Sequence, residues 1–218
     1  MGGLNMIDSI GFDLDGTLWD YADQYATIFG KIVKHLPGVH TPSVSEVHAV
    51  TGLAAADYIS NLFPELKNQT VAFLQEIFHE AEIIGCDEAM MKSGLLYNKM
   101  EETLHILSKK YKLFIASNCE PLYLDNFLKT HNLSRFFSDS ICQHSHGSKS
   151  TKGENILEVI RRNSFHSTVF VGDAQSDADA AKFANVPFIW ASYGYGSVPD
   201  ARYIIDQPID LLSRIQEI

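Results

Sequence analysis

Basic residues, cysteines and long apolar runs are all scarce in this sequence of 218 residues. There are 17 lysines and arginines against 27 aspartates and glutamates, which gives a formal net charge of −10. Nucleic acids and anionic membranes bind clustered cations, so this balance argues against both as partners. The three cysteines, Cys86, Cys119 and Cys142, form no CxxC pair, which argues against a disulfide framework and favours a reducing compartment, the cytoplasm. No segment is long enough to suggest a membrane span.

Two carboxylates stand close together near the beginning of the chain, in the segment Asp13-Leu14-Asp15-Gly16-Thr17. The residues before Asp13 are mostly apolar and predict a buried strand that ends at the acids. Because neighbouring carboxylates repel each other, the pair favours a Mg²⁺ ion bound through oxygen ligands. If a phosphate also bound there, Asp13 could attack phosphorus and Asp15 could handle the proton of the leaving oxygen. A plain Asp-Gly turn is the alternative interpretation, and the strand in front favours the functional one.

The rest of the chain changes its pattern once. Residues 19–94 show helical periodicity and no convincing strand, whereas from residue 98 short apolar strands alternate with helices. Alternation of this kind predicts an α/β fold, a Rossmann-like three-layer core with a parallel sheet. The core would comprise residues 1–18 and 95–218, with a small all-helical cap domain, residues 19–94, inserted after the first strand. Ligands in such sheets bind at the carboxyl ends of the strands.

The expected elements follow from apolar spacing and from capping residues. Ser43 and Glu46 form a capping-box pattern, and Pro121 suits the first turn of a helix. Strands are expected at residues 113–116, 139–142, 168–171, 187–190 and 203–205. Helices are expected at residues 19–34, 44–50, 54–63, 70–84, 100–109, 121–131, 154–162, 179–184 and 210–216.

The segment Phe12–Leu18, FDLDGTL, resembles the signature of the haloacid dehalogenase (HAD) superfamily in its phosphatase form. This resemblance implies three further motifs in a fixed order. Ser117, at the end of a predicted strand, resembles the second motif, although on the residues alone it could equally cap the helix that begins at Pro121. Lys152 directly precedes a predicted helix and resembles the third motif. Lys149 is a rival, and many relatives have proline where this chain has Gly153.

The fourth motif is matched by Gly172-Asp173 with a second acid at Asp177. The resemblance implies that Asp173 binds Mg²⁺ and that Asp177 holds a metal-bound water or orients Lys152, whereas on the residues alone Asp177 could equally cap a helix. The resemblance therefore implies that the catalytic residues are Asp13, Asp15, Ser117 and Lys152. The implied metal ligands are Asp13, Asp15 (through its backbone carbonyl), Asp173 and Asp177. The implied substrate-binding residues are Thr17, Ser117, Asn118 and Lys152.

The expected activity is hydrolysis of a small phosphorylated metabolite with Mg²⁺ as cofactor and an aspartyl phosphate as intermediate. The helical insert and the loop Trp190–Gly196 resemble those of phosphoglycolate-phosphatase-like members, so phosphoglycolate or a related phosphomonoester is the expected substrate. Thr51-Gly52, Lys31 and Lys34 are candidates for setting specificity.

Alternative functions are a sugar phosphomutase similar to β-phosphoglucomutase, a haloacid dehalogenase, and a non-enzymatic receiver-like phosphoacceptor. Dehalogenation needs no Mg²⁺ and no acid at the position of Asp15, and receiver modules are shorter and lack a cap. A zinc site at Cys142, His144 and His146 is disfavoured, because a structural zinc needs a fourth ligand and usually a wider spacing.

Overall fold

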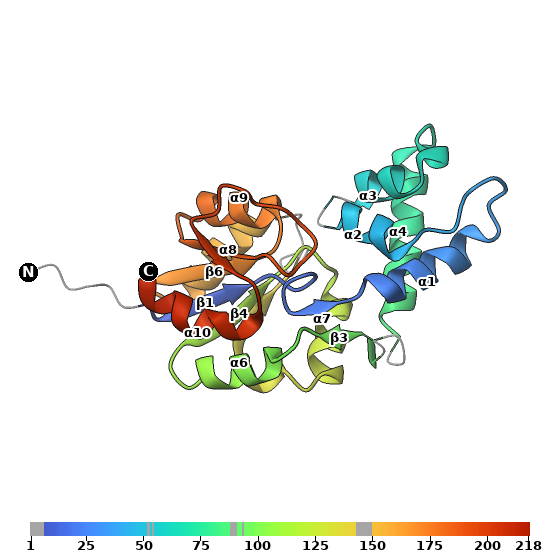
Figure 1. Cartoon of the computed structure of the whole chain (residues 1–218). Coiled ribbons are helices and arrows are strands. Elements are labelled where there is room, and N and C mark those ends of the chain that lie inside the picture. Colours follow the sequence, from blue (N-terminus) through green and yellow to red (C-terminus); the bar gives the residue numbers. More distant parts are fainter. Residues whose placement is uncertain (1–6, 52, 54, 88–90, 93, 143–149) are drawn as a thin grey trace, which may run out of the picture.

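A parallel six-stranded sheet forms the centre of the protein (Figure 1). The computed structural model describes residues 7–51, 53, 55–87, 91–92, 94–142 and 150–218. The strands lie in the order β5-β4-β1-β6-β7-β8, and every pairing between neighbours is parallel. Their bounds are β1 Ser9–Phe12, β4 Lys112–Ala116, β5 Phe137–Ile141, β6 Thr168–Gly172, β7 Phe188–Ala191 and β8 Tyr203–Ile205. The expected α/β class and all the expected strands are confirmed.

Helices cover both faces of the sheet. On one face lie α8 (Lys152–Asn163) and α9 (Gln175–Phe183), and on the other lie α6 (Met100–Leu107), α7 (Pro121–Thr130) and α10 (Leu211–Arg214) (Figure 1). Short 3₁₀ helices occur at Ser134–Phe136, Pro208–Asp210 and Ile215–Glu217. The two faces have separate apolar clusters because alternate strand residues point to opposite sides. Phe114 and Phe170 pack under α8 and α9, whereas Ile10 and Phe12 pack on the opposite side.

The segment between the first strand and residue 94 is mainly helical, as its periodicity predicts. It contains α1 (Ala22–Val33), α2 (Val44–Val50), α3 (Ala55–Leu62), a 3₁₀ turn at Pro64–Leu66 and α4 (Val71–Gly85). Figure 1 shows these helices together at the end of the molecule farthest from the C-terminus. The expected capping box begins α2: the Glu46 amide donates to Ser43 Oγ (3.3 Å), and the Ser43 amide donates to Glu46 Oε2 (2.8 Å).

One expectation for this segment is wrong. Trp19 and Asp20 form a strand, β2, that pairs antiparallel with β3 (Leu95–Leu96), instead of the first turn of a helix. The indole N–H of Trp19 donates to Asp15 Oδ1 (2.8 Å), which holds the chain extended there, and α1 begins only after Asp20. Helical periodicity could not reveal this pair because its partner strand lies at the far end of the insert. The β2–β3 pair joins the two connections between the helical segment and the core.

No helix among the described residues is both long enough and apolar enough to cross a bilayer.

Gly11 leaves room for two rings that meet across the central strand. A Cβ atom at this position would overlap the ring of Phe114 and lie 2.7 Å from Cδ2 of Phe170. Since both rings are fully buried, they have little freedom to move aside.

We therefore expect Gly11→Ala to lower the free energy of unfolding by about 1 to 3 kcal/mol, which is the usual cost of overpacking a core. Urea unfolding followed by circular dichroism measures the change. The matched control is Lys112→Ala, an exposed strand position, for which a change within about 0.5 kcal/mol is expected. Equal midpoints for the two variants would contradict this account of the core.

Candidate active site

Three of the motif residues stand where neighbouring strands end. Asp13 follows β1, Ser117 follows β4 and Asp173 follows β6, and these three strands are adjacent in the sheet. Phe12 pairs in register with both Ile115 and Val171, so all three strands end at one edge. Segments far apart in the sequence are thereby brought to one place, as parallel topology requires.

Lys152 connects two of the carboxylates. Its Nζ lies 2.8 Å from Asp13 Oδ1 and 2.6 Å from Asp177 Oδ1, and the lysine side chain is only 8% exposed. Lys152 is the first residue of α8, whose start is fixed by a capping box between Thr151 and Glu154. Burial alone would lower the pKa of Lys152, but the charges of Asp13 and Asp177 outweigh it and hold the pKa above its usual value.

Asp177 supports two elements with its two oxygens. Oδ1 accepts from Lys152, while Oδ2 accepts from the backbone amides of Asp173 (3.1 Å) and Ala174 (3.0 Å) at the start of α9. The carboxylate is completely buried. Helix capping and orientation of Lys152, which the sequence left as alternatives, therefore occur together in this residue.

Oxygen atoms of Asp13, Asp173 and Asp177 lie within 4.8 Å of one another. Asp173 is held by the backbone amides of Tyr195 (2.8 Å) and Gly196 (3.2 Å), which donate to its Oδ2. Burial and then the charge of Asp177 raise the pKa of Asp173 to about 6, and the same two causes raise the pKa of Asp13 well above its usual value although Lys152 opposes them. The local negative charge thus exceeds what one lysine compensates. Oxygen donors with excess negative charge are suited to Mg²⁺.

Asp15 lies apart from that group of three. Its Oδ1 accepts hydrogen bonds from the indole N–H of Trp19 (2.8 Å) and from the hydroxyl of Tyr123 (2.9 Å). Burial raises the pKa of Asp15 to about 6, although both hydrogen bonds oppose the rise. A carboxyl with such a pKa can release or accept a proton near neutral pH. Sequence reasoning did not identify Tyr123, because a tyrosine at helical spacing has the pattern of an ordinary core residue.

The residues expected to contact substrate differ in position. Ser117, Asn118 and Lys152 line a cavity of about 960 Å³, together with Asp13, Asp15 and Asp173. Thr17 does not line it: its buried hydroxyl donates to Asp173 Oδ1 at 3.3 Å. Ser117 does not cap α7, because the N-cap residue is Glu120. Instead, Ser117 Oγ accepts from the amide of Cys119 at 3.4 Å.

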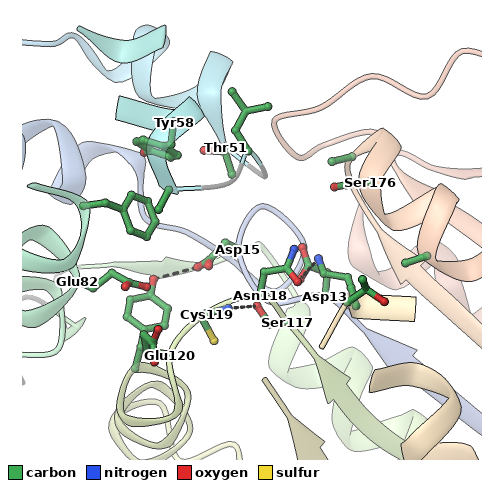
Figure 2. A pocket seen from close by; sticks show the side chains of 18 of the residues that line it. Asp13, Asp15, Thr51, Tyr58, Glu82, Ser117, Asn118, Cys119, Glu120 and Ser176 are labelled. Carbon is green, nitrogen blue, oxygen red and sulfur yellow. Dashed lines mark hydrogen bonds and ion pairs between the residues drawn. The ribbon is translucent and has the colours of Figure 1, made fainter. Parts of the chain in front are cut away.

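The cavity has one wall in the core and one in the helical segment (Figure 2). In Figure 2, Asp13, Ser117 and Asn118 lie on one side, Glu82 and Glu120 lie on the other, and Asp15 lies between them. Residues of the helical segment in the lining include Thr51, Tyr58, Phe78 and Glu82. Of these, sequence reasoning identified only Thr51.

Other expectations turn out differently. Lys31 and Lys34 are exposed on the helical segment and do not line the cavity, so they are poor candidates for setting specificity. Gly52 and Lys149 lie outside the described residues. So do His144 and His146, which were considered with Cys142 as a zinc site.

The fold and the site together define a Rossmann-like α/β protein with buried carboxylates at the carboxyl ends of its strands. Residues 10–191 match the model of a family described as haloacid dehalogenase-like hydrolase, and the chain belongs to this family. It is therefore an enzyme, and the interpretation as a non-enzymatic receiver module is set aside.

Similar proteins agree with this assignment. The chain is 27% identical over 209 residues to a phosphoglycolate phosphatase of Agrobacterium fabrum, covering 91% of this chain and 86% of that protein. It is 24% identical over 229 residues to a phosphoglycolate phosphatase of Vibrio vulnificus, covering 94% and 95% of the two chains. A crystal structure described as a predicted phosphatase from Clostridium acetobutylicum has the same fold, with a TM-score of 0.84 at 21% identity over 98% of this chain and 100% of that chain.

The Lys152 ion pairs give a test of the site that does not depend on activity. Replacing Lys152 by Met would leave the fully buried Asp177 without its cation, and breaking a buried ion pair in this way costs about 3 to 5 kcal/mol. Urea unfolding of Lys152→Met should show that loss. The control is Lys182→Met on the exposed side of α9, for which a change within about 0.5 kcal/mol is expected. A Lys152→Met protein as stable as the control would mean that the two ion pairs are not formed in solution.

Proposed function

We propose that this enzyme is a Mg²⁺-dependent phosphatase that hydrolyses a small phosphomonoester through an aspartyl phosphate on Asp13. The observation that carries the proposal is the meeting of Asp13, Lys152 and Asp173 on one side of a single cavity, with Asp15 held separately beside them. A nucleophile, a fixed cation and an independent proton donor are what phosphoryl transfer requires. The phosphatase names of the relatives support this choice.

In the first step, an Asp13 carboxylate oxygen attacks phosphorus and the bond from phosphorus to the ester oxygen breaks. Asp15 gives its proton to the departing alcohol. In the second step, Asp15 takes a proton from water, the water oxygen attacks phosphorus, and the bond from Asp13 to phosphorus breaks to release phosphate. Trp19 and Tyr123 fix Asp15 for both proton transfers by donating to its Oδ1.

The phosphoryl group would be held by Lys152 and by Ser117 and Asn118, which line the cavity beside Asp13. The buried ammonium of Lys152 offsets negative charge that builds on the phosphoryl oxygens. Asp13, Asp173 and the backbone carbonyl of Asp15 would hold Mg²⁺, while Asp177 keeps Lys152 in place. When bound, Mg²⁺ neutralises charge on the phosphate and orients it for attack.

The helical segment, residues 19–94, would act as a cap domain on the core formed by residues 1–18 and 95–218. Its side chains Tyr58, Phe78 and Glu82 face the same cavity as the reactive carboxylates. A cap in this position excludes bulk water and supplies contacts to the organic part of the substrate. Cys86, Cys119 and Cys142 form no disulfide with one another, which supports a place in the cytoplasm.

The presence of Asp15 argues for ester hydrolysis over dehalogenation. Displacing a halide needs no proton donor, yet this carboxyl is held by two hydrogen bonds and lines the cavity. Its pKa of about 6 suits a group that alternately gives and takes a proton.

The nucleophile is tested with Asp13→Asn. An amide is a poor nucleophile, so kcat for p-nitrophenyl phosphate should fall by roughly a thousandfold or more. Release of inorganic phosphate is the measurement, and it also separates hydrolysis from phosphoryl transfer within a sugar phosphate. The control is Asp125→Asn, an exposed residue of α7, which should keep the native rate. Native turnover by Asp13→Asn would refute the aspartyl phosphate mechanism.

The metal is tested by binding as well as by activity. Mg²⁺ at about a hundredfold above its dissociation constant should stabilise the folded protein by about 2.7 kcal/mol. A rise in the thermal unfolding midpoint reports this, and treatment with EDTA should reverse the rise and abolish turnover. Asp173→Asn should remove the shift, whereas Asp179→Asn, an exposed acid of α9 outside the group of three, should retain it. An equal shift in both variants would rule out Asp173 as a ligand.

A further inference from the structure

The cavity is strongly acidic beyond the groups that the reaction uses. Its described lining includes six carboxylates, and Lys152 is the single lysine or arginine among those residues. That lysine is already engaged by Asp13 and Asp177. Three of the carboxylates have no part in the proposed mechanism: Glu82 of α4, Glu120 directly before α7 and Asp179 of α9. Glu82 and Glu120 lie on the side of the cavity away from Asp13 (Figure 2).

Glu82 and Glu120 are close enough to repel each other. Burial and then the charge of Glu120 raise the pKa of Glu82 to about 8, although a hydrogen bond from the Glu120 backbone amide opposes the rise. Within the described part of the chain, neither glutamate forms an ion pair with a lysine, arginine or histidine. A cation brought in by a ligand would remove this repulsion.

Aromatic rings surround the same end of the cavity. Tyr58 and Phe78 form an edge-to-face pair with ring centroids 5.2 Å apart, and Tyr21 and Tyr25 form another at 4.6 Å. Tyr25 also lies close enough to Glu82 for the glutamate charge to raise the tyrosine pKa, after the larger effect of burial. Ring faces beside carboxylates attract organic cations.

Tyr58 adds an unused polar atom to this wall. Its side chain is 2% exposed and lines the cavity, yet its hydroxyl makes no well-formed hydrogen bond to a described residue, although the hydroxyls of Tyr21 and Thr51 lie near enough to oppose the rise that burial causes in its pKa. The nearby hydroxyls of Tyr21 and Thr51 are bonded to each other at 3.0 Å. Buried hydroxyls are rarely left unpaired, so this one points to a polar group on the substrate.

We propose that the substrate is a phosphomonoester bearing a protonated amine. The ammonium group would be held between Glu82 and Glu120, against the aromatic rings of Tyr21, Tyr25, Tyr58 and Phe78. This inference rests on the proposed phosphatase function and specifies its substrate class. A phosphorylated carboxylic acid such as phosphoglycolate would place its carboxylate beside Glu120, where the described lining offers no lysine or arginine other than Lys152 to pair with it, which opposes its binding. The cavity of about 960 Å³ is also larger than a two-carbon acid requires.

The test is a length series of alkyl phosphates with two, three or four carbons, each ending in an amine, a methyl group or a carboxylate. At the best chain length, kcat/KM for the amine-terminated phosphate should exceed kcat/KM for the methyl-terminated phosphate by about tenfold or more, as a charge-assisted hydrogen bond allows. For the carboxylate-terminated phosphate, kcat/KM should be lower than for the methyl-terminated phosphate. A preference for methyl or carboxylate at every length would overturn the inference.

p-Nitrophenyl phosphate, which has no amine, separates the two proposals. Hydrolysis of this ester without any amine preference leaves the phosphatase function standing and rejects the substrate class. No hydrolysis of any ester, in the presence of Mg²⁺, rejects the phosphatase function and the substrate class with it.

Substitutions of Glu82 and Glu120 test whether these two glutamates cause the preference for the amine-terminated phosphate. Glu82→Gln and Glu120→Gln should each lower the amine-to-methyl ratio of kcat/KM by about tenfold, mainly through KM for the amine. Glu80→Gln removes the same charge from an exposed position of α4 and should keep the ratio of the unmodified enzyme. An unchanged ratio in both Glu82→Gln and Glu120→Gln would overturn the assignment. Since the ester series uses the unmodified enzyme, its result stands even if a variant fails to fold.

Discussion

The buried ammonium of Lys152 is the interaction on which the rest of the site depends. Three carboxylates, those of Asp13, Asp173 and Asp177, approach one another in a region from which water is largely excluded. Without a cation, their repulsion and desolvation would oppose the folded arrangement. Lys152 bonds directly to two of them, and Asp177 in turn bonds to the backbone that carries Asp173. Asp13, Lys152 and the start of α9 thus form one connected network.

The parallel sheet brings the members of this network together. Strands β4, β1 and β6 are neighbours, so residues separated by more than a hundred positions end at a common edge. The helix α8 then presents Lys152 from its first turn, where the capping box of Thr151 and Glu154 fixes the start. Precision at the site therefore comes from strand register and helix capping, both of which fix the course of the backbone.

The cavity combines two different chemical environments. On the side of Asp13, a lysine and a group of oxygen ligands are suited to a phosphoryl group and Mg²⁺. On the side of Glu82 and Glu120, carboxyl groups that form no ion pair with a described lysine, arginine or histidine, together with tyrosine rings, are suited to an organic cation. Asp15 stands between the two, held by Trp19 and Tyr123, where the leaving oxygen of an ester would connect both parts. The β2–β3 pair, to which Trp19 belongs, links this arrangement to the helical segment.

The sequence by itself determined the fold class, the order of the motifs and most of the helices and strands, because these depend on local patterns. An apolar run before Asp13, alternating strands and helices, and capping residues such as Ser43 act over a few neighbouring positions. Only the tertiary structure decided that Thr17 bonds to Asp173 away from the cavity, that Trp19 lies in a strand, and that Glu82 and Glu120 line the same cavity. A glutamate or tyrosine on an amphipathic helix has the same local pattern whether it faces solvent, core or cavity. Its role depends on which distant segment packs against it, and that is fixed by the assembled sheet and helices.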